Sequence, residues 1–187
     1  RASYRMEIDK IVNSLIRSAR QKIAVIYQDD AFGKDGLLSA EAALKQHGLK
    51  PVAIATVQRN SAQINPALRV LEKAQPNAVI IISTYVSSAA LSRALLQKNI
   101  KARIMNVSFV GTRALENSLP VGQANGIGVS QVVPFPWDRW IPVVADYQRL
   151  MRVNNSSARF GFTSLEGFMA ARLITEGIKN VQGPLTR

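Results

Sequence analysis

KIAVIYQDDAFGKDG, residues 22–36, is the stretch that decides the fold. Residues 22–27 form a short, continuous apolar run rich in β-branched side chains, which is typical of a strand covered on both faces. The loop that follows contains three aspartates and two glycines, and apolar residues then resume at helical spacing from Leu37. The stretch therefore predicts a strand, a turn and a helix, which is the repeating unit of a parallel α/β sheet.

The same alternation continues on both sides of this stretch. An amphipathic helix is predicted before it, over residues 8–19, because apolar residues recur there at three- and four-residue spacing. Further strands are predicted at residues 52–57, 78–82, 103–107 and 127–132, and further helices at residues 37–44, 64–74, 87–97 and 112–117. Alternating elements of these lengths imply right-handed crossovers, so we expect an α/β fold with a doubly wound, five-stranded parallel sheet.

The sequence changes character after Val133. Residues 134–138, PFPWD, form an aromatic connector interrupted by prolines, and two extra C-terminal helices are predicted at 139–153 and 163–180 with no strand between them. The predicted organisation is an α/β domain at residues 1–133 and a helical segment at residues 134–187. The apolar stripes of the last two helices need a surface to cover.

Composition limits the possible partners. The chain has 187 residues, 47% of them hydrophobic, and a formal charge of +12, but Lys and Arg are scattered and no run of three occurs. Scattered charge predicts a solvated basic surface and no nucleic-acid partner. The absence of cysteine excludes disulfides and thiolate chemistry. No apolar run reaches the roughly 18 to 20 residues that a membrane-spanning helix needs.

Signals for catalysis, cofactors or metals are missing. Neither G-x-G-x-x-G nor a P-loop ending occurs, so no nucleotide cofactor is expected. The single histidine, His47, lies before Gly48 at a predicted helix end, where a surface role is expected. Asp29 and Asp30 lack metal-ligand spacing, and Asx-turn or helix-capping roles are favoured. We therefore expect a protein that is not an enzyme and has no metal site.

Ligands of open parallel sheets bind beyond the carboxyl ends of the strands. The loops predicted at those ends contain the candidate ligand-binding residues Phe32, Tyr85, Ser108 and Phe109. Aromatic rings and hydroxyls suit a small organic molecule, which they hold by stacking and a few oriented hydrogen bonds. For Tyr85 and Phe109, ordinary loop packing is the alternative.

Residues 22–36 resemble the strand, loop and helix that open the second lobe of leucine/isoleucine/valine-type binding proteins, in the type I periplasmic binding protein family. Residues 80–88, 126–136 and 164–172 are similar to the same family, so the resemblance covers essentially the whole chain. It implies that residues 1–133 form the second ligand-binding lobe. Residues 134–187 would be a hinge-following segment whose two helices pack on a first lobe that this chain lacks.

The resemblance also implies a function and a location. Such proteins are exported to the periplasm, capture an amino acid or a related carboxylate between two lobes and deliver it to an ABC permease in the membrane. The alternative is a ligand-sensing domain of a receptor or transcriptional regulator with the same fold.

Site roles follow position by position from the same resemblance. Phe32 matches an aromatic residue that lines the cleft, and Tyr85 matches a tyrosine that contacts the ligand. Ser108 falls where amino-acid-binding members carry a glutamate that pairs with the ammonium group of the ligand. A hydroxyl cannot neutralise a desolvated cation, so this departure favours carboxylates, amides or short peptides over an ordinary α-amino acid.

Overall fold

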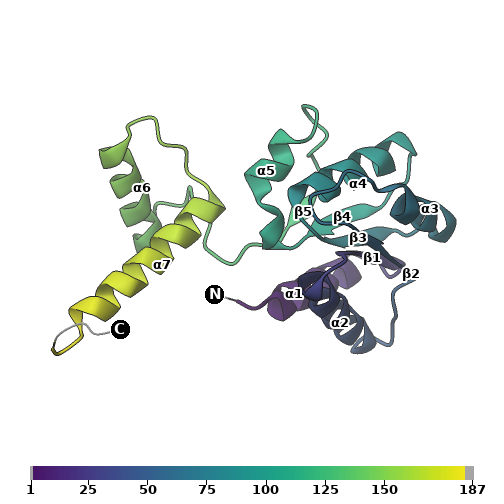
Figure 1. The fold of residues 1–187 in the computed structure, drawn as a ribbon, viewed down its shortest axis with the longest axis horizontal. Helices are drawn as coiled ribbons and strands as arrows, with labels where there is room; N and C mark the ends of the chain where they lie inside the picture. The colour runs from purple at the N-terminus through teal and green to yellow at the C-terminus, as the bar shows by residue number, and fades with distance from the viewer. Residues whose placement is uncertain (1, 184–187) are drawn as a thin grey trace. The chain divides into compact units, whose positions relative to one another are not determined.

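The computed structural model describes residues 2–183 and divides the chain into two compact units. The first unit ends at Gln131 and the second begins at Val132. The first contains a sheet of five parallel strands in the order β2-β1-β3-β4-β5 (Figure 1). The strands are β1 Ile23–Gln28, β2 Ala53–Val57, β3 Ala78–Ile82, β4 Arg103–Asn106 and β5 Gly128–Val129. The predicted α/β fold with a five-stranded parallel sheet is confirmed.

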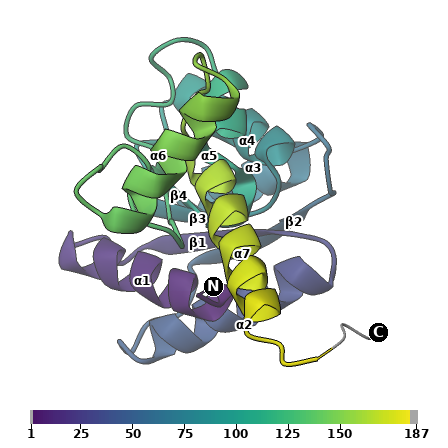
Figure 2. The same cartoon turned by 90° about the vertical axis from the view of Figure 1, so that its left-hand side faces the viewer.

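Helices cover both faces of this sheet. They are α1 Tyr4–Arg17, α2 Ala31–Lys45, α3 Asn65–Ala74, α4 Tyr85–Gln97, the short 3-10 helix η1 Ser108–Val110 and α5 Thr112–Asn117. Helices α1 and α2 lie side by side on one face, and α3 and α4 lie on the other (Figures 1 and 2). The carboxyl ends of the strands therefore remain as an edge between the two helical layers.

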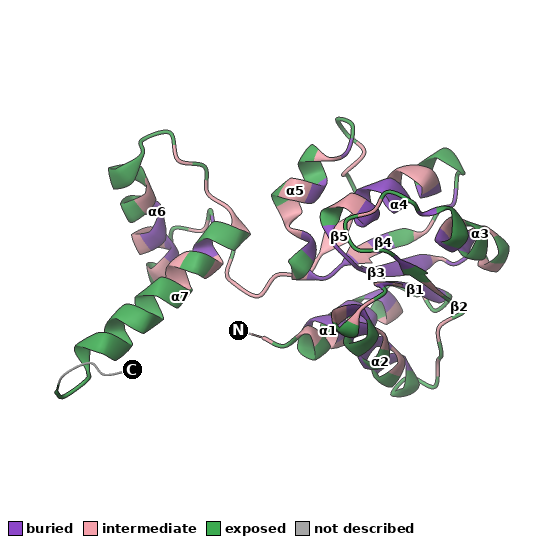
Figure 3. Cartoon of the chain, in the orientation of Figure 1, coloured by how far each residue is buried: buried purple, intermediate pink, exposed green. Residues whose placement is uncertain are grey.

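The centre of the sheet explains the apolar runs in the sequence. Val25 and Ile80 pack toward α1 and α2, whereas Ile26 and Ile81 pack toward α3 and α4, and all four are fully buried (Figure 3). Successive residues of a strand point to opposite faces, so a strand with both faces covered carries apolar residues at consecutive positions.

Several element boundaries differ from the prediction. Helix α2 begins at Ala31 and not at residue 37, so Phe32 lies in its first turn and not in a loop. Helix α1 begins at Tyr4 because the Ser3 side chain accepts a hydrogen bond from the Met6 amide at 3.3 Å and so caps the helix. Helix α4 begins at Tyr85 and not at residue 87, since the extended backbone of Thr84 already ends the turn after β3. The strand predicted at residues 127–132 contains only Gly128–Val129, an edge strand from which the chain soon leaves the sheet.

The second unit is a pair of helices, α6 Pro142–Asn154 and α7 Phe162–Lys179. Its small core contains the buried side chains of Val144, Tyr147 and Leu165. Only the first part of α7 takes part, and its later apolar residues are exposed (Figure 3). Ala171, Ile174 and Ile178 of the predicted α7 stripe are thus exposed within this unit, and the packing of the stripe on a further lobe stays a prediction.

None of the helices described within residues 2–183 combines the length and the apolar character that a membrane crossing requires.

Candidate ligand-binding site at the carboxyl edge of the sheet

The turn between β1 and α2 fixes the position of Phe32. Asp30 caps α2, because its Oδ1 accepts a hydrogen bond from the Gly33 amide at 2.9 Å. This hydrogen bond lowers the pKa of the Asp30 carboxyl from its ordinary value of 3.8. A Cβ at Gly33 would lie 1.8 Å from the Gln28 carbonyl oxygen, so only glycine permits this close approach. The predicted capping role of Asp30 is confirmed.

Three aromatic rings gather at this edge. The ring centroid of Phe32 lies 4.6 Å from that of Phe109 and 4.9 Å from that of Tyr4, and Tyr4 lies 6.4 Å from Phe109. We call Tyr4, Phe32 and Phe109 the aromatic trio. Their centroid separations are those of favourable edge and tilted ring pairs.

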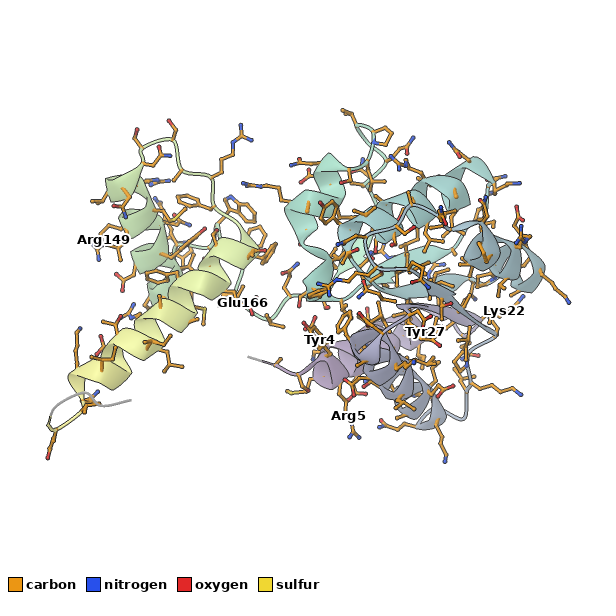
Figure 4. The ribbon with its side chains drawn as sticks, viewed as in Figure 1. Tyr4, Arg5, Lys22, Tyr27, Arg149 and Glu166 are labelled. Atoms are coloured by element: carbon orange, nitrogen blue, oxygen red, sulfur yellow. The ribbon has the colours of Figure 1, made fainter. Side chains whose placement is uncertain are left out.

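The trio is partly open to solvent. Phe109 is 40% exposed, and Tyr4 and Phe32 are of intermediate exposure. The structure therefore brings two of the predicted site residues together and adds Tyr4, which sequence reasoning missed. Tyr4 precedes the helix predicted at residues 8–19, and only the structure shows that this helix begins at Tyr4. Figure 4 labels Tyr4 at the first turn of α1.

A buried carboxylate lies one helical turn beyond Tyr4. Glu7 is only 4% exposed. Its Oε2 accepts hydrogen bonds from the Ser108 amide at 2.8 Å and the Ser130 hydroxyl at 2.6 Å, and its Oε1 accepts one from the Ser108 hydroxyl at 2.9 Å. A carboxylate in such a place requires several donors, and these three supply them.

Sequence reasoning also missed Glu7. A lone glutamate in an amphipathic helix is usually solvated, but Glu7 shares the helix face of Ile11 and Leu15, which are buried. The four-residue spacing to these apolar residues was the signal in the sequence that Glu7 is buried.

The environment of Ser108 differs from the one that the sequence suggested. The Ser108 hydroxyl donates a hydrogen bond to the Glu7 carboxylate of α1, so a negative charge lies next to this hydroxyl. A serine disfavours an ammonium ligand only where no carboxylate lies beside it. The structure places a carboxylate there, from a residue far away in the sequence.

Tyr85 is not a member of the trio. It is the first residue of α4 and not a loop residue, and its side chain is 42% exposed. Among the residues described, its ring stacks on no member of the trio. Its predicted contact with ligand stays a prediction.

The other polar residues of interest serve the fold or the surface. His47 is exposed, and its Nε2 lies 2.9 Å from the Asn13 Oδ1. Asp29 is exposed, and its Oδ2 accepts a hydrogen bond from the Gln58 Nε2 at 3.5 Å. Within residues 2–183, no group of three or more histidine or acidic side chains is arranged to hold a metal ion.

The strand order, the paired helical layers and the open carboxyl edge are those of a lobe of a type I periplasmic binding protein. The chain matches the model of the periplasmic binding protein family over residues 1–187, and it belongs to that family. The family consists of solute-binding proteins, not enzymes, and it implies an extracytoplasmic location.

Solved structures agree with this assignment. A possible leucine/isoleucine/valine-binding protein from Rhodopirellula baltica SH 1 is 32% identical, with a TM-score of 0.92 over 98% of this chain and 51% of that chain. A substrate-binding periplasmic protein from Ralstonia solanacearum is 28% identical, with a TM-score of 0.88 over 99% of this chain and 53% of that one. An extracellular ligand-binding receptor from Verminephrobacter eiseniae ef01-2 is 25% identical, with a TM-score of 0.85 and coverage of 99% and 53%.

The chain thus spans about half the length of the solved structures that it matches. None of the curated proteins compared with it matches.

Proposed function

We propose that this chain supplies one jaw of an extracytoplasmic solute-binding protein, which captures an amino acid or a related carboxylate between two lobes and delivers it to an ABC permease. The observations that carry the proposal are the aromatic trio and the buried Glu7 carboxylate bound to Ser108, both at the edge where parallel sheets bind ligands. These groups support the binding of a ligand and not covalent chemistry.

The trio provides the apolar wall of the site. Rings that pack against one another have little freedom left to lose when a ligand covers them, so their exposed area contributes to binding at a low entropic cost. Phe109 is the most exposed ring of the three and is the first that a ligand would contact.

Glu7 indicates the ligand class. Its negative charge is held beneath the Ser108 hydroxyl, away from bulk water, where a charge acts more strongly than at an exposed site. Amino-acid-binding members carry a glutamate at the position that matches Ser108, and in this chain the Glu7 carboxylate of α1 is hydrogen-bonded to Ser108. Of the two ligand classes, this charge favours an amino acid, whose ammonium group it would attract. The similarity to a possible leucine/isoleucine/valine-binding protein supports the same choice.

The mechanism would be conformational. A ligand that contacts both lobes binds the closed form more tightly than the open form and shifts the equilibrium toward closure. The closed form would then dock on the permease.

A thermal-shift comparison on the full-length protein tests the proposal. Leucine, isoleucine and valine are compared with 4-methylpentanoate, which is leucine without its ammonium group. We expect the amino acids to raise the melting temperature, because a ligand that binds only the folded state stabilises it by mass action. A shift with 4-methylpentanoate alone would keep the binding function and contradict the role of Glu7. No shift with any branched-chain compound would contradict the proposed ligand class.

A further inference from the structure

A second hollow lies at the opposite, amino-terminal edge of the sheet. It has a volume of about 230 Å³ and is lined by the segment leading into β4 and by the loop before β5. The polar and charged residues that line it are Arg20, Lys101, Arg103, Gln123 and Asn125. Figure 4 labels Lys22, which marks this amino-terminal edge at the start of β1, and Tyr4, which marks the other end of the unit.

One backbone carbonyl joins the Arg20 side chain to the Arg103 backbone. The Asn77 carbonyl accepts a hydrogen bond from the Arg20 Nη1 at 3.0 Å and another from the Arg103 amide, also at 3.0 Å. The Arg103 guanidinium also lies beside Gly126, since a Cβ at that glycine would be 3.8 Å from its Nη1. Each guanidinium has five N–H donors, so these contacts leave donors of both groups for a ligand.

The charges at the hollow are not balanced. Arg20, Lys101 and Arg103 line it, and none of the described residues that line it is acidic. Glu72 of α3 already forms an ion pair with Lys98 at 2.9 Å. Three cations around one hollow repel one another, and an anion that entered would relieve this repulsion.

The geometry points to a binding site for a phosphate group in this hollow. Two guanidinium groups and one ammonium match an anion with several oxygens and more than one charge, because guanidinium binds phosphate through paired hydrogen bonds. A single carboxylate would leave more of the positive charge unbalanced. The amides of Gln123 and Asn125 would add neutral donors at the rim. This site lies at the edge opposite the aromatic trio, so it is independent of the proposed solute-binding function.

Calorimetric titration of the full-length protein with inorganic phosphate tests the site. The buffer keeps ionic strength constant with chloride, so that a specific ion is distinguished from general screening. We expect saturable binding to the wild-type protein and a loss of at least about tenfold in affinity in the double variant Lys101→Gln, Arg103→Gln. The matched control is Arg69→Gln with Lys73→Gln, which removes two exposed cations from α3 and should leave the affinity unchanged. Circular dichroism checks that each variant is folded.

The source of the phosphate is then assigned by two further probes. Binding of glycerol 3-phosphate without binding to phosphatidylglycerol vesicles indicates a soluble ligand, and sedimentation with those vesicles but not with phosphatidylcholine vesicles indicates a lipid headgroup. Either result supports the site if the double variant no longer binds the glycerol 3-phosphate or the vesicles that the wild type binds. The proposal would be overturned if titration with chloride released the same heat as titration with phosphate. It would also be overturned if the α3 control variant lost as much phosphate affinity as the double variant.

Discussion

Glu7 and Ser108 are 101 positions apart in the sequence, yet two hydrogen bonds join them, one from the Ser108 amide at 2.8 Å and one from its hydroxyl at 2.9 Å. Ser130 adds a third from the chain just after β5. One carboxylate thus links the first helix to the carboxyl ends of two adjacent strands. Tyr4 precedes Glu7 on α1 and Phe109 follows Ser108, so the carboxylate holds together the two segments that carry these rings of the trio.

Glu7→Gln should destabilise the protein by about 2 to 3 kcal/mol, because an amide keeps the shape but turns one accepting oxygen into a donor that faces donors. Ser108→Ala should cost less, about 1 kcal/mol, since the backbone amide of residue 108 still donates to the carboxylate. Urea unfolding at neutral pH measures both differences in the free energy of unfolding.

Glu116→Gln is the matched control, because Glu116 is exposed on α5 and its change should be within about 0.5 kcal/mol of zero. If Glu7→Gln were as harmless as this control, Glu7 would not be the link that the structure indicates.

Replacing Gly33 or Gly167 by alanine should change the stability of the protein in opposite directions. Gly33→Ala would place a Cβ 1.8 Å from the Gln28 carbonyl oxygen, so we expect a loss of about 3 kcal/mol or a protein that does not fold. Gly167 lies inside α7, and a Cβ there would meet nothing within 4 Å, so Gly167→Ala should stabilise its helix by about 0.5 to 1 kcal/mol. Thermal melts monitored by circular dichroism compare the two, and equal effects would be inconsistent with the close approach at Gly33.

The Asp30 cap should make stability depend on pH in the acid range. Its pKa is lowered in the folded state, so its charge stabilises the fold above the ordinary value of 3.8, and this contribution is lost as the pH falls through the lower folded value. Asp30→Ala should cost about 1 kcal/mol at about pH 6 and progressively less below pH 3.8. Urea unfolding at both ends of this range measures the difference, and a cost that does not change with pH would contradict the charged cap.

Much of the fold could be predicted because its strongest signals are local. Strands β1 and β3 are covered on both faces, so their apolar runs are continuous, and the cap of α2 follows from Asp30 alone. The short β5 could not be predicted, since its end is set by where an edge strand leaves the sheet and not by its own β-branched residues.

Only part of the candidate site could be predicted from the sequence in this way. Phe32 and Phe109 could be selected because the carboxyl ends of parallel strands meet at one edge. The partners of Ser108 could not, because a contact between residues so distant in the sequence depends on how α1 packs on the sheet. Tyr85 could be selected by the same rule, and the structure places it at the first position of α4, where its contact with ligand stays a prediction.

The most direct test of the central claim is calorimetric titration of the full-length protein with leucine, for the wild type and for the variants Phe109→Ala and Val121→Ala. Both side chains are exposed, but Phe109 belongs to the trio and Val121 does not. If the trio is the apolar wall of the site, Phe109→Ala weakens leucine binding by about tenfold or more and Val121→Ala leaves it unchanged. Leucine binding that is equally tight in the wild type and in Phe109→Ala would contradict the account.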